Sequence, residues 1–445
     1  MSAGAALELD SLNAIQRDAV LHDEGPLLLL AGAGSGKTRV VTHRIARLLI
    51  EGAAPDSVLA LTFTNRAARE MRERVFALLG ADDLPGLTIS TFHSLGARFL
   101  RQHATAVGRT RAFTIYDDDD QSAVLREALA DLNAGLTAKG VRAWRRAIDQ
   151  AKNAGLDARE ATPPSEGAFL DPAEVGARYE LLMERADAFD FGDLILRPAQ
   201  ILTEVQSLAE RYRERWRWVL VDEFQDTNRA QYAWLRTFAP PDSNLFVVGD
   251  DDQSIYGWRG AEVENILQFP HEYPRARVVR LEQNYRSDGH ILRAANGVIA
   301  HNDRRLGKDL WTERGEGTRI ELYEGHDARA EARWVAERIA GLCRDEGYAP
   351  GDVAVLMRAN HLSLDLEETL TRAGLRYAVV RGRSFYDRAE VRDAIAYVRL
   401  LVNPNDDVAF RRAIGVPTRG VGKTSLARLA EFADGRDQSA LAAAP

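Results

Sequence analysis

The chain has 445 residues, which is too many for one ordinary hydrophobic core, so we expect two to four domains. A hydrophobic content of 45% with 28% charged residues is typical of a globular protein, and the single cysteine, Cys343, excludes a disulfide framework or a cysteine-based zinc site. The formal net charge of −8 argues only weakly against a nucleic-acid partner, because binding responds to local patches rather than to the average over the surface.

A short amphipathic helix is predicted over residues 12–20, with Asn13 near its start. Gln16 lies on this helix, and a glutamine is ordinary on a helix surface. Its amide offers a donor and an acceptor together, so it could equally recognise the edge of an adenine base. Position alone does not decide between these two interpretations.

A glycine-rich loop follows the apolar run 27–30 and leads into a helical pattern. This order of strand, loop and helix is typical of a P-loop, in which backbone N–H groups converge on phosphate oxygens. The expected loop residues are Ala33, Gly34, Ser35 and Gly36. We expect Lys37 to reach the β- and γ-phosphates and the Thr38 hydroxyl to hold Mg²⁺. The strict pattern has glycine where this chain has Ala31, and a chance glycine-rich turn is the alternative.

Two further strands are predicted over residues 57–63 and 87–90, each followed by a helix. Their carboxyl ends carry polar and aromatic residues, among them Phe63 and His93. Because ligands bind at this edge of a parallel sheet, an exposed Phe63 or His93 would suit stacking on a base. Either residue could instead be part of the core, and from the residues alone we favour the core.

The pattern from about residue 95 to 205 is mostly helical and predicts a helical insertion in an α/β domain. Four successive aspartates, residues 117–120, are best explained as acidic residues at a helix start, where they favour the helix dipole. A metal site made by these four is not expected, because neighbours on a helix point apart.

The α/β pattern resumes with a strand predicted over residues 216–221, which ends in two adjacent carboxylates. Paired with the phosphate loop, this arrangement predicts that Asp222 binds Mg²⁺ and that Glu223 orients and deprotonates an attacking water. Adjacent acids at a strand end are common by chance, but the upstream loop makes the chance explanation poor.

A buried strand over residues 245–248 is followed by Gln253, which could reach a γ-phosphate, and then by a glycine-containing turn. The turn carries Tyr256, Trp258 and Arg259. Stacking a base on such a side chain contributes about 1–3 kcal/mol and tolerates any base sequence. The turn therefore predicts a surface for single-stranded nucleic acid.

Taken together, the motifs resemble those of the UvrD/Rep/PcrA helicases, and they occur in the same order. They cover residues 12–16, 31–38, 61–68, 91–94, 221–226, 249–261 and 281–287, with further matches at 403–407 and 417–422. The resemblance covers essentially the whole chain, and the set is very specific.

The resemblance implies roles at matching positions. Gln16 would recognise adenine, Tyr285 would stack on it with Arg39 nearby, and Arg286 would approach the γ-phosphate from a second domain. The positions that would line a single-stranded DNA track are Phe63, Asn65, Thr91, His93, Tyr256, Trp258, Arg259 and Asn360. After Asn360 the chain departs from the usual family pattern at residues 361–364, so a contact from an arginine is absent or replaced.

The resemblance also implies two RecA-like α/β domains with helical insertions. We expect the first RecA-like domain at 1–90 and 206–280, its helical insertion at 91–205, part of the second RecA-like domain at 281–384, and the start of a second insertion at 385–445. The family's last two ATPase motifs have no counterpart before Pro445, so we expect the chain to be the amino-terminal portion of a longer enzyme, with impaired activity.

The function implied by the resemblance is that of an ATP-dependent single-stranded DNA translocase and 3′–5′ helicase in DNA repair or replication. It would use ATP and Mg²⁺ and act on single strands and single-strand/duplex junctions. The motor half of a helicase–nuclease, an RNA track and a non-motor P-loop switch stay open as alternatives. No apolar run reaches membrane-spanning length and no secretory leader is evident, so we expect a cytoplasmic protein with no membrane partner.

Overall fold

The computed structural model describes residues 7, 9–380, 388–436 and 438–444. These form two compact units, one made of residues 1–317 and 393–445 and the other of residues 318–392. The boundary expected at 384/385 lies outside the described residues, and the division into four domains stays a prediction.

A six-stranded, wholly parallel sheet forms the centre of the first unit, with strand order β3-β2-β6-β7-β1-β8. The strands are β1 (Leu27–Ala31), β2 (Val58–Thr62), β3 (Thr88–Thr91), β6 (Trp218–Val221), β7 (Asn244–Gly249) and β8 (Arg277–Leu281). The five strands predicted from the sequence are confirmed, and β8 is an addition. The α/β fold class is therefore correct, and a parallel sheet of this kind is consistent with a RecA-like domain.

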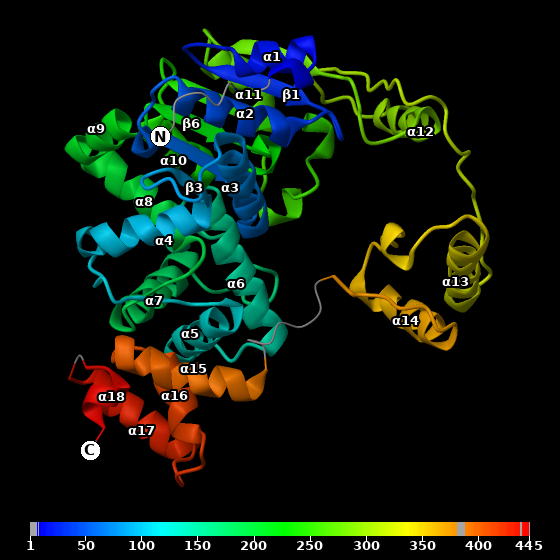
Figure 1. Ribbon diagram of the computed structural model, residues 1–445. Coiled ribbons are helices and arrows are strands. Elements are labelled where there is room, and N and C mark those ends of the chain that lie inside the picture. The colour runs from blue at the N-terminus through cyan, green and yellow to red at the C-terminus, as the bar shows by residue number, and fades with distance from the viewer. Residues whose placement is uncertain (1–6, 8, 381–387, 437, 445) are drawn as a thin grey trace. The chain divides into compact units, whose positions relative to one another are not determined.

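Both faces of the sheet are covered by helices (Figure 1). The flanking helices are α1 (Ala14–Val20), α2 (Lys37–Ile50), α3 (Asn65–Leu79), α10 (Arg229–Phe238) and α11 (Glu264–Glu272), whereas α12 (Gly289–Ile299), which follows β8, contributes to neither core. Alternate strand residues enter different cores: Leu29 and Val248 pack with α1, α2 and α3, whereas Leu28 and Val247 pack with α10 and α11. Burial on both faces explains why these strands appear in the sequence as continuous apolar runs rather than alternating ones.

A mostly helical segment lies between β3 and β6, as predicted. Its helices are α4 (Phe92–His103), α5 (Asp118–Asp131), α6 (Ala138–Asn153), α7 (Pro172–Arg185), α8 (Asp193–Glu204) and α9 (Gln206–Arg215), and the short strands β4 (Thr114–Ile115) and β5 (Ala188–Phe189) pair in parallel. The Asp117 carboxylate accepts hydrogen bonds from the backbone N–H groups of Asp119 and Asp120, so the acidic run begins α5 as expected.

A buried ion cluster holds the inserted helices together. The Nζ atom of Lys152, which is fully buried, lies 2.8 Å from Glu180, 2.7 Å from Asp190 and 2.9 Å from Asp193. Arg197 also contacts Glu180 and Asp193, at 2.6 and 3.1 Å. Buried charges are tolerated only when paired in this way, so the cluster depends on each of its members.

The last described helices are α15 (Ala389–Val402), α16 (Asp407–Gly415), α17 (Lys423–Asp434) and α18 (Ala440–Ala443). Asn403 and Asp406, in the connection between α15 and α16, are buried. Asn403 Nδ2 donates to the backbone oxygens of Ala186 and Asp187, and Asp406 accepts from the Tyr116 hydroxyl at 2.8 Å. These contacts explain the polar residues of the 403–407 motif, because they join this segment to the inserted helices (Figure 1).

The second unit contains α13 (Ala328–Asp345) and α14 (Ser363–Arg372), which share a small core that includes Ala336, Ile339 and Leu366. The resemblance implied part of an α/β domain here, but no strand occurs among residues 318–380. Apolar side chains of its non-helical segments remain exposed, and Leu356 is 91% exposed. A strand requires a hydrogen-bonded neighbour, and these described segments have none.

Across the described ranges, no helix combines the length and the apolar character that a membrane crossing would require.

We predict that Lys152→Met lowers the free energy of unfolding by about 3–5 kcal/mol, because it leaves Glu180, Asp190 and Asp193 buried without their ammonium partner. Urea unfolding followed by circular dichroism would measure the loss. Lys139→Met, at an exposed position of α6, is the matched control and should change little. Equal stability of the two variants would contradict the structural role given to the cluster.

Candidate nucleotide and nucleic-acid site

The glycine-rich loop lies between the end of β1 and the start of α2. Gly34 and Gly36 have φ angles of 68° and 89°, in the left-handed region that favours glycine. A Cβ added to Gly34 would lie 2.7 Å from Asn284 Nδ2, so glycine also allows a close approach. Gly36 gives α2 no side-chain cap, which leaves N–H groups of its first turn available to an anion. This is the geometry expected of a phosphate loop.

Gln16 supports this loop from α1. It is buried, its Nε2 donates to the Ser35 backbone oxygen at 2.9 Å, and its Oε1 accepts from the Asn13 N–H at 3.2 Å. The surface interpretation of Gln16 is therefore wrong. One N–H and one acceptor lone pair of the amide remain for a base edge, so adenine recognition stays a prediction.

The segment after β8 lies against the same loop. Asn284 Nδ2 donates to the Ala33 backbone oxygen at 2.6 Å, and the Tyr285 N–H donates to the Gly34 oxygen at 3.0 Å. The half-exposed Tyr285 ring is tethered through its hydroxyl, which accepts from Asn13 Nδ2 at 2.7 Å. Tyr285 is thus placed beside the loop, next to the helix that carries Gln16.

The two predicted arginines are both exposed, Arg39 on α2 and Arg286 after Tyr285. A Cβ at Gly34 would lie 2.8 Å from the Cβ of Arg286, which puts Arg286 next to the phosphate loop. Its proposed approach to a γ-phosphate stays a prediction. Asn284, which fixes this segment, was not singled out in the sequence, although it lies within the matched motif.

The acidic end of β6 faces the loop lysine. Lys37 Nζ lies 3.1 Å from Glu223 Oε2. Glu223 has a φ of 53°, a left-handed conformation that is uncommon for a residue with a side chain and that tends to be retained at functional sites. Thr38 follows on the first turn of α2 and is half-buried. The sequence-predicted lysine and general base are therefore in contact.

Around Lys37, the carboxylate groups outnumber the cationic side chains. Burial, followed by repulsion from Glu223, raises the pKa of Asp222 to about 7, and the same two causes raise the pKa of Asp226 to about 7. One oxygen of Asp226, Oδ1, is buried without a hydrogen-bond partner. A set of oxygen donors short of positive charge fits Mg²⁺, which prefers such ligands. Asp222 and Thr38 fit the predicted metal-binding role.

Two glutamines connect the acidic strand end to the turn after β7. Gln225 Nε2 donates to Glu223 Oε2 at 2.9 Å, and its Oε1 accepts from the Asp250 N–H at 2.9 Å. Asp250 in turn accepts a hydrogen bond from Gln253 Nε2. Gln253 is therefore held by a network that reaches Lys37. Gln225 was missed in the sequence, where nothing marked it except its place within the 221–226 motif.

An aromatic and cationic surface follows in the same turn. The rings of Phe63 and Tyr256 stack at 4.9 Å between centroids, and the Arg259 guanidinium lies 4.6 Å from the Trp258 ring centroid. Trp258 is 70% exposed, as expected for a side chain that stacks on a ligand. The core interpretation of Phe63 is wrong, because its side chain is only half-buried.

The end of β3 supplies a second aromatic pair. His93 is half-buried, between the core and the exposed interpretations, and its ring lies edge-on to Phe191 at 6.0 Å. Burial lowers the pKa of His93 to about 4, so the ring is neutral near pH 7 and suits stacking rather than phosphate binding. Phe191, which is exposed, was missed because it lies in the insertion far from the other motifs in sequence.

Two other expected track residues have structural partners. Thr91 is buried and caps α4, where its Oγ1 accepts from the Ser94 N–H at 3.2 Å and bonds to Asn65 Oδ1 at 3.3 Å. The first unit therefore brings the side chains of Asn65 and Thr91 into contact. Asn360 begins a short 3-10 helix of the second unit, and its side chain lies outside what the structure describes.

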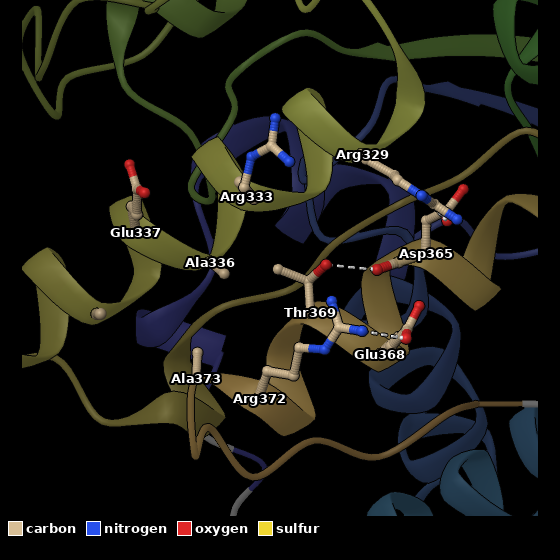
Figure 2. Close-up of a pocket in the computed structure, with 10 residues that line it drawn as sticks. Arg329, Arg333, Ala336, Glu337, Asp365, Glu368, Thr369, Arg372 and Ala373 are labelled. Carbon is tan, nitrogen blue, oxygen red and sulfur yellow. Dashed lines mark hydrogen bonds and ion pairs between the residues drawn. The ribbon is translucent and has the colours of Figure 1, made fainter.

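A groove of about 420 Å³ between α13 and α14 is a weaker candidate (Figure 2). Its arginines are neutralised locally: Arg372 pairs with Glu368 at 2.6 Å, and Arg329 pairs with Asp365 at 3.5 Å. Thr369 donates its hydroxyl to the carbonyl of Asp365 on its own helix. These contacts are typical of a solvated helix pair, and we assign no site to this groove.

The phosphate loop, the acidic strand end opposite it and the parallel sheet together define a P-loop α/β protein. A family model described as the UvrD/REP helicase N-terminal domain matches residues 12–274, and one described as the UvrD-like helicase C-terminal domain matches residues 279–437. The chain belongs to the UvrD/REP helicase family, and the resemblance seen in the sequence is confirmed.

Curated relatives with the name ATP-dependent DNA helicase PcrA are similar along nearly the whole chain. The protein from Bacillus subtilis (strain 168) is 46% identical over 435 residues, which cover 96% of this chain and 58% of the relative. Those from Leuconostoc citreum and Staphylococcus aureus (strain Mu50 / ATCC 700699) are each 44% identical over 96% of this chain and cover 57% and 58% of the relatives.

The expectation that the chain is truncated before the family's carboxyl-terminal part is wrong, because the C-terminal domain model matches residues 279–437. That expectation rested on the absence of two short motifs and on a second insertion that stops midway. The chain spans slightly more than half the length of the curated relatives it matches.

We predict that Asp222→Asn raises the melting temperature at pH 8 in EDTA. With its pKa raised to about 7, Asp222 keeps a proton in the folded chain that the unfolded chain releases from about pH 4 upward. The carboxyl therefore lowers stability as the pH rises through this window, and the amide removes that penalty. Each kcal/mol recovered corresponds to about 2–4 °C.

Thermal melting of the wild type and the variant at pH 5 and pH 8 would measure this effect. The advantage of Asp222→Asn should shrink at pH 5, where the wild-type carboxyl is protonated. Asp82→Asn, at an exposed position, is the control and should show no such pH dependence. A variant no more stable than the wild type at pH 8 would argue against an uncompensated carboxylate at this position.

Proposed function

We propose that the protein is an ATP-dependent single-stranded DNA translocase and 3′–5′ helicase. The observation that supports this most strongly is that one short turn carries both chemistries. Gln253 belongs to the hydrogen-bond network of the phosphate loop, and Tyr256 and Trp258 follow within five residues on the same turn. A nucleotide and a stacked strand would therefore act on the same piece of backbone.

In the proposed site, the N–H groups of the loop and Lys37 bind the β- and γ-phosphates of ATP. Glu223, released from Lys37, orients the attacking water and accepts its proton. Gln253 and Arg286 contact the γ-phosphate, and Gln16 and Tyr285 hold the adenine beside Arg39. Mg²⁺, bound through Thr38 and Asp222, would neutralise charge on the phosphate oxygens.

The proposed DNA track runs over the carboxyl ends of β2, β3 and β7. Its members are Phe63, Asn65, Thr91, His93, Tyr256, Trp258 and Arg259, to which we add Phe191 because its exposed ring contacts His93. Asn360, in the second unit, is a further DNA-binding residue that rests on the family resemblance alone. We further propose the domain division expected from the sequence, in which two RecA-like domains close on ATP. The proposed substrates include single-strand/duplex junctions. Strand polarity and a place in DNA repair or replication rest on the family resemblance.

A non-motor P-loop switch is the second candidate, since the nucleotide site alone would serve it equally well. A switch of this kind does not explain why Trp258 is exposed and lies against the Arg259 guanidinium, close to the hydrogen-bond network of the phosphate loop. We therefore rank it lower. A helicase–nuclease motor and an RNA track would use the same residues, so substrate comparison rather than geometry separates them.

Glu223→Gln should retain MgATP binding but lose hydrolysis, because the amide keeps the shape and hydrogen bonds of the side chain yet cannot take a proton from water. A loss of about 10²–10⁴ in turnover is expected for a general base. Phosphate release and fluorescent-nucleotide titration would be measured in parallel. Glu214→Gln, on the exposed face of α9, is the control. Loss of binding together with turnover would assign Glu223 to structure or metal binding.

Trp258→Ala should weaken single-stranded DNA binding by about 1–3 kcal/mol, with little dependence on base sequence. Fluorescence anisotropy at one fixed salt concentration would measure it, because phosphate contacts make affinity salt-dependent. Phe169→Ala removes another exposed aromatic, 78% exposed and in a loop of the insertion, and should leave affinity unchanged. Equal affinities for the wild type and Trp258→Ala would remove the turn from the track.

A further inference from the structure

Lys308 is a buried lysine that does not itself line the nucleotide site. It follows α12 in sequence and is 6% exposed. Its Nζ lies 2.7 Å from Asp250 and 2.8 Å from Asp252, and it also pairs with Asp251 between them. Three carboxylates from one turn therefore converge on a single ammonium group.

Further contacts connect the same two segments. The Leu306 N–H donates to Asp251 Oδ2 at 2.6 Å, and Arg305 Nη2 lies 2.9 Å from Asp252 Oδ2. Residues 305–308 thus hold the turn 250–252 through backbone and side chain together. The contacts join positions more than fifty residues apart, from the two sides of β8.

The turn held in this way positions the phosphate-site glutamine. Asp250, one of the Lys308 partners, accepts from Gln253 Nε2, and its N–H donates to Gln225. Gln225 in turn donates to Glu223, the partner of Lys37. Lys308 is therefore two contacts away from Gln253 and is connected to the general base through Asp250 and Gln225.

The three carboxylates also lie close enough together to suggest a metal site. Lys308 fills the position that an ion would take, and it supplies positive charge and donors directed at all three residues. Lys308 and Arg305 together pair with the three carboxylates, while Asp252 Oδ1 is buried without a hydrogen-bond partner. The ion pairs account for the cluster as a support without a bound cation.

We propose that Lys308 is a positioning residue for ATP hydrolysis: it fixes the turn 250–252 so that Gln253 is directed at the phosphate. This inference rests on the proposed ATPase function. It also gives the segment after α12 a direct influence on the phosphate site, because movement of Lys308 would move Asp250 and its partners. Lys308 itself touches no reacting atom, so its effect is on geometry. A misplacement of about 1 Å in such a site can reduce the rate on the order of a hundredfold.

The test compares Lys308→Met and Lys308→Arg with the wild type. Three quantities are measured: ATP turnover with its KM, the dissociation constant for MgATP, and amide hydrogen exchange over residues 249–260. Lys308→Met should lower kcat on the order of ten- to a hundredfold with a nearly unchanged nucleotide affinity, and exchange should rise in 249–260. Lys308→Arg, which keeps the charge, should recover part of both effects.

Arg304→Met is the matched control. Arg304 lies in the same segment but is exposed and pairs with Glu264 at 2.9 Å, so neither exchange nor kcat should change. Arg305→Gln is a milder variant for the case in which Lys308→Met unfolds. It should lower kcat and raise hydrogen exchange over residues 249–260, each by less than Lys308→Met does. Thermal melting establishes that each variant is folded at the assay temperature.

Unchanged kcat and unchanged exchange over 249–260 in folded Lys308→Met, or in folded Arg305→Gln, would overturn the proposal. A fall in nucleotide affinity equal to the fall in kcat/KM would also overturn it, because it would assign Lys308 to binding. A wild-type chain without ATP turnover would refute the proposed function instead, and the exchange comparison would still decide whether Lys308 orders the turn.

Discussion

The carboxyl edge of the parallel sheet is the constraint on which the proposed function depends. In a parallel sheet every strand ends at the same edge, so residues far apart in sequence meet there. The phosphate loop follows β1, the pair Asp222 and Glu223 follows β6, and Asp250 follows β7, which lies between them. The aromatic residues that follow β2 and β3 occupy the neighbouring part of the edge. Nucleotide chemistry and base stacking are thus adjacent because the strands are adjacent.

The buried carboxylates at this edge have different numbers of cationic partners in two places. Around Lys37, the buried carboxylates of Asp222 and Asp226 have raised pKa values and one orphaned oxygen, which is the state expected of a site that binds a cation with its ligand. Around Lys308, the ammonium group contacts all three aspartates, and Arg305 adds a second cation at Asp252, whose Oδ1 is buried without a hydrogen-bond partner. The first arrangement suits binding, and the second suits the rigid support of Gln253.

The sequence allowed prediction of the parts that depend on local pattern. The apolar runs and their polar ends placed five strands of the sheet, and the loop, Asp222 and Glu223 followed from motif spacing. Contacts between distant segments could not be predicted: Asn284 on the phosphate loop, Phe191 beside His93, and Lys308 on the 250–252 turn are fixed by tertiary packing alone. The second unit departed furthest from expectation: the resemblance implied part of an α/β domain, but residues 318–380 contain no strand, because strand formation depends on a hydrogen-bonded neighbour as well as on an apolar pattern.

The most direct test of the central claim is the rate of ATP hydrolysis by the wild-type chain with and without single-stranded DNA, at saturating MgATP. If the turn that carries Gln253 and the aromatic surface couples DNA binding to ATP hydrolysis, single-stranded DNA should raise kcat. A duplex of the same length without single-stranded ends should raise kcat less. A hydrolysis rate that is the same with and without DNA would contradict the account and favour a nucleotide switch with no motor.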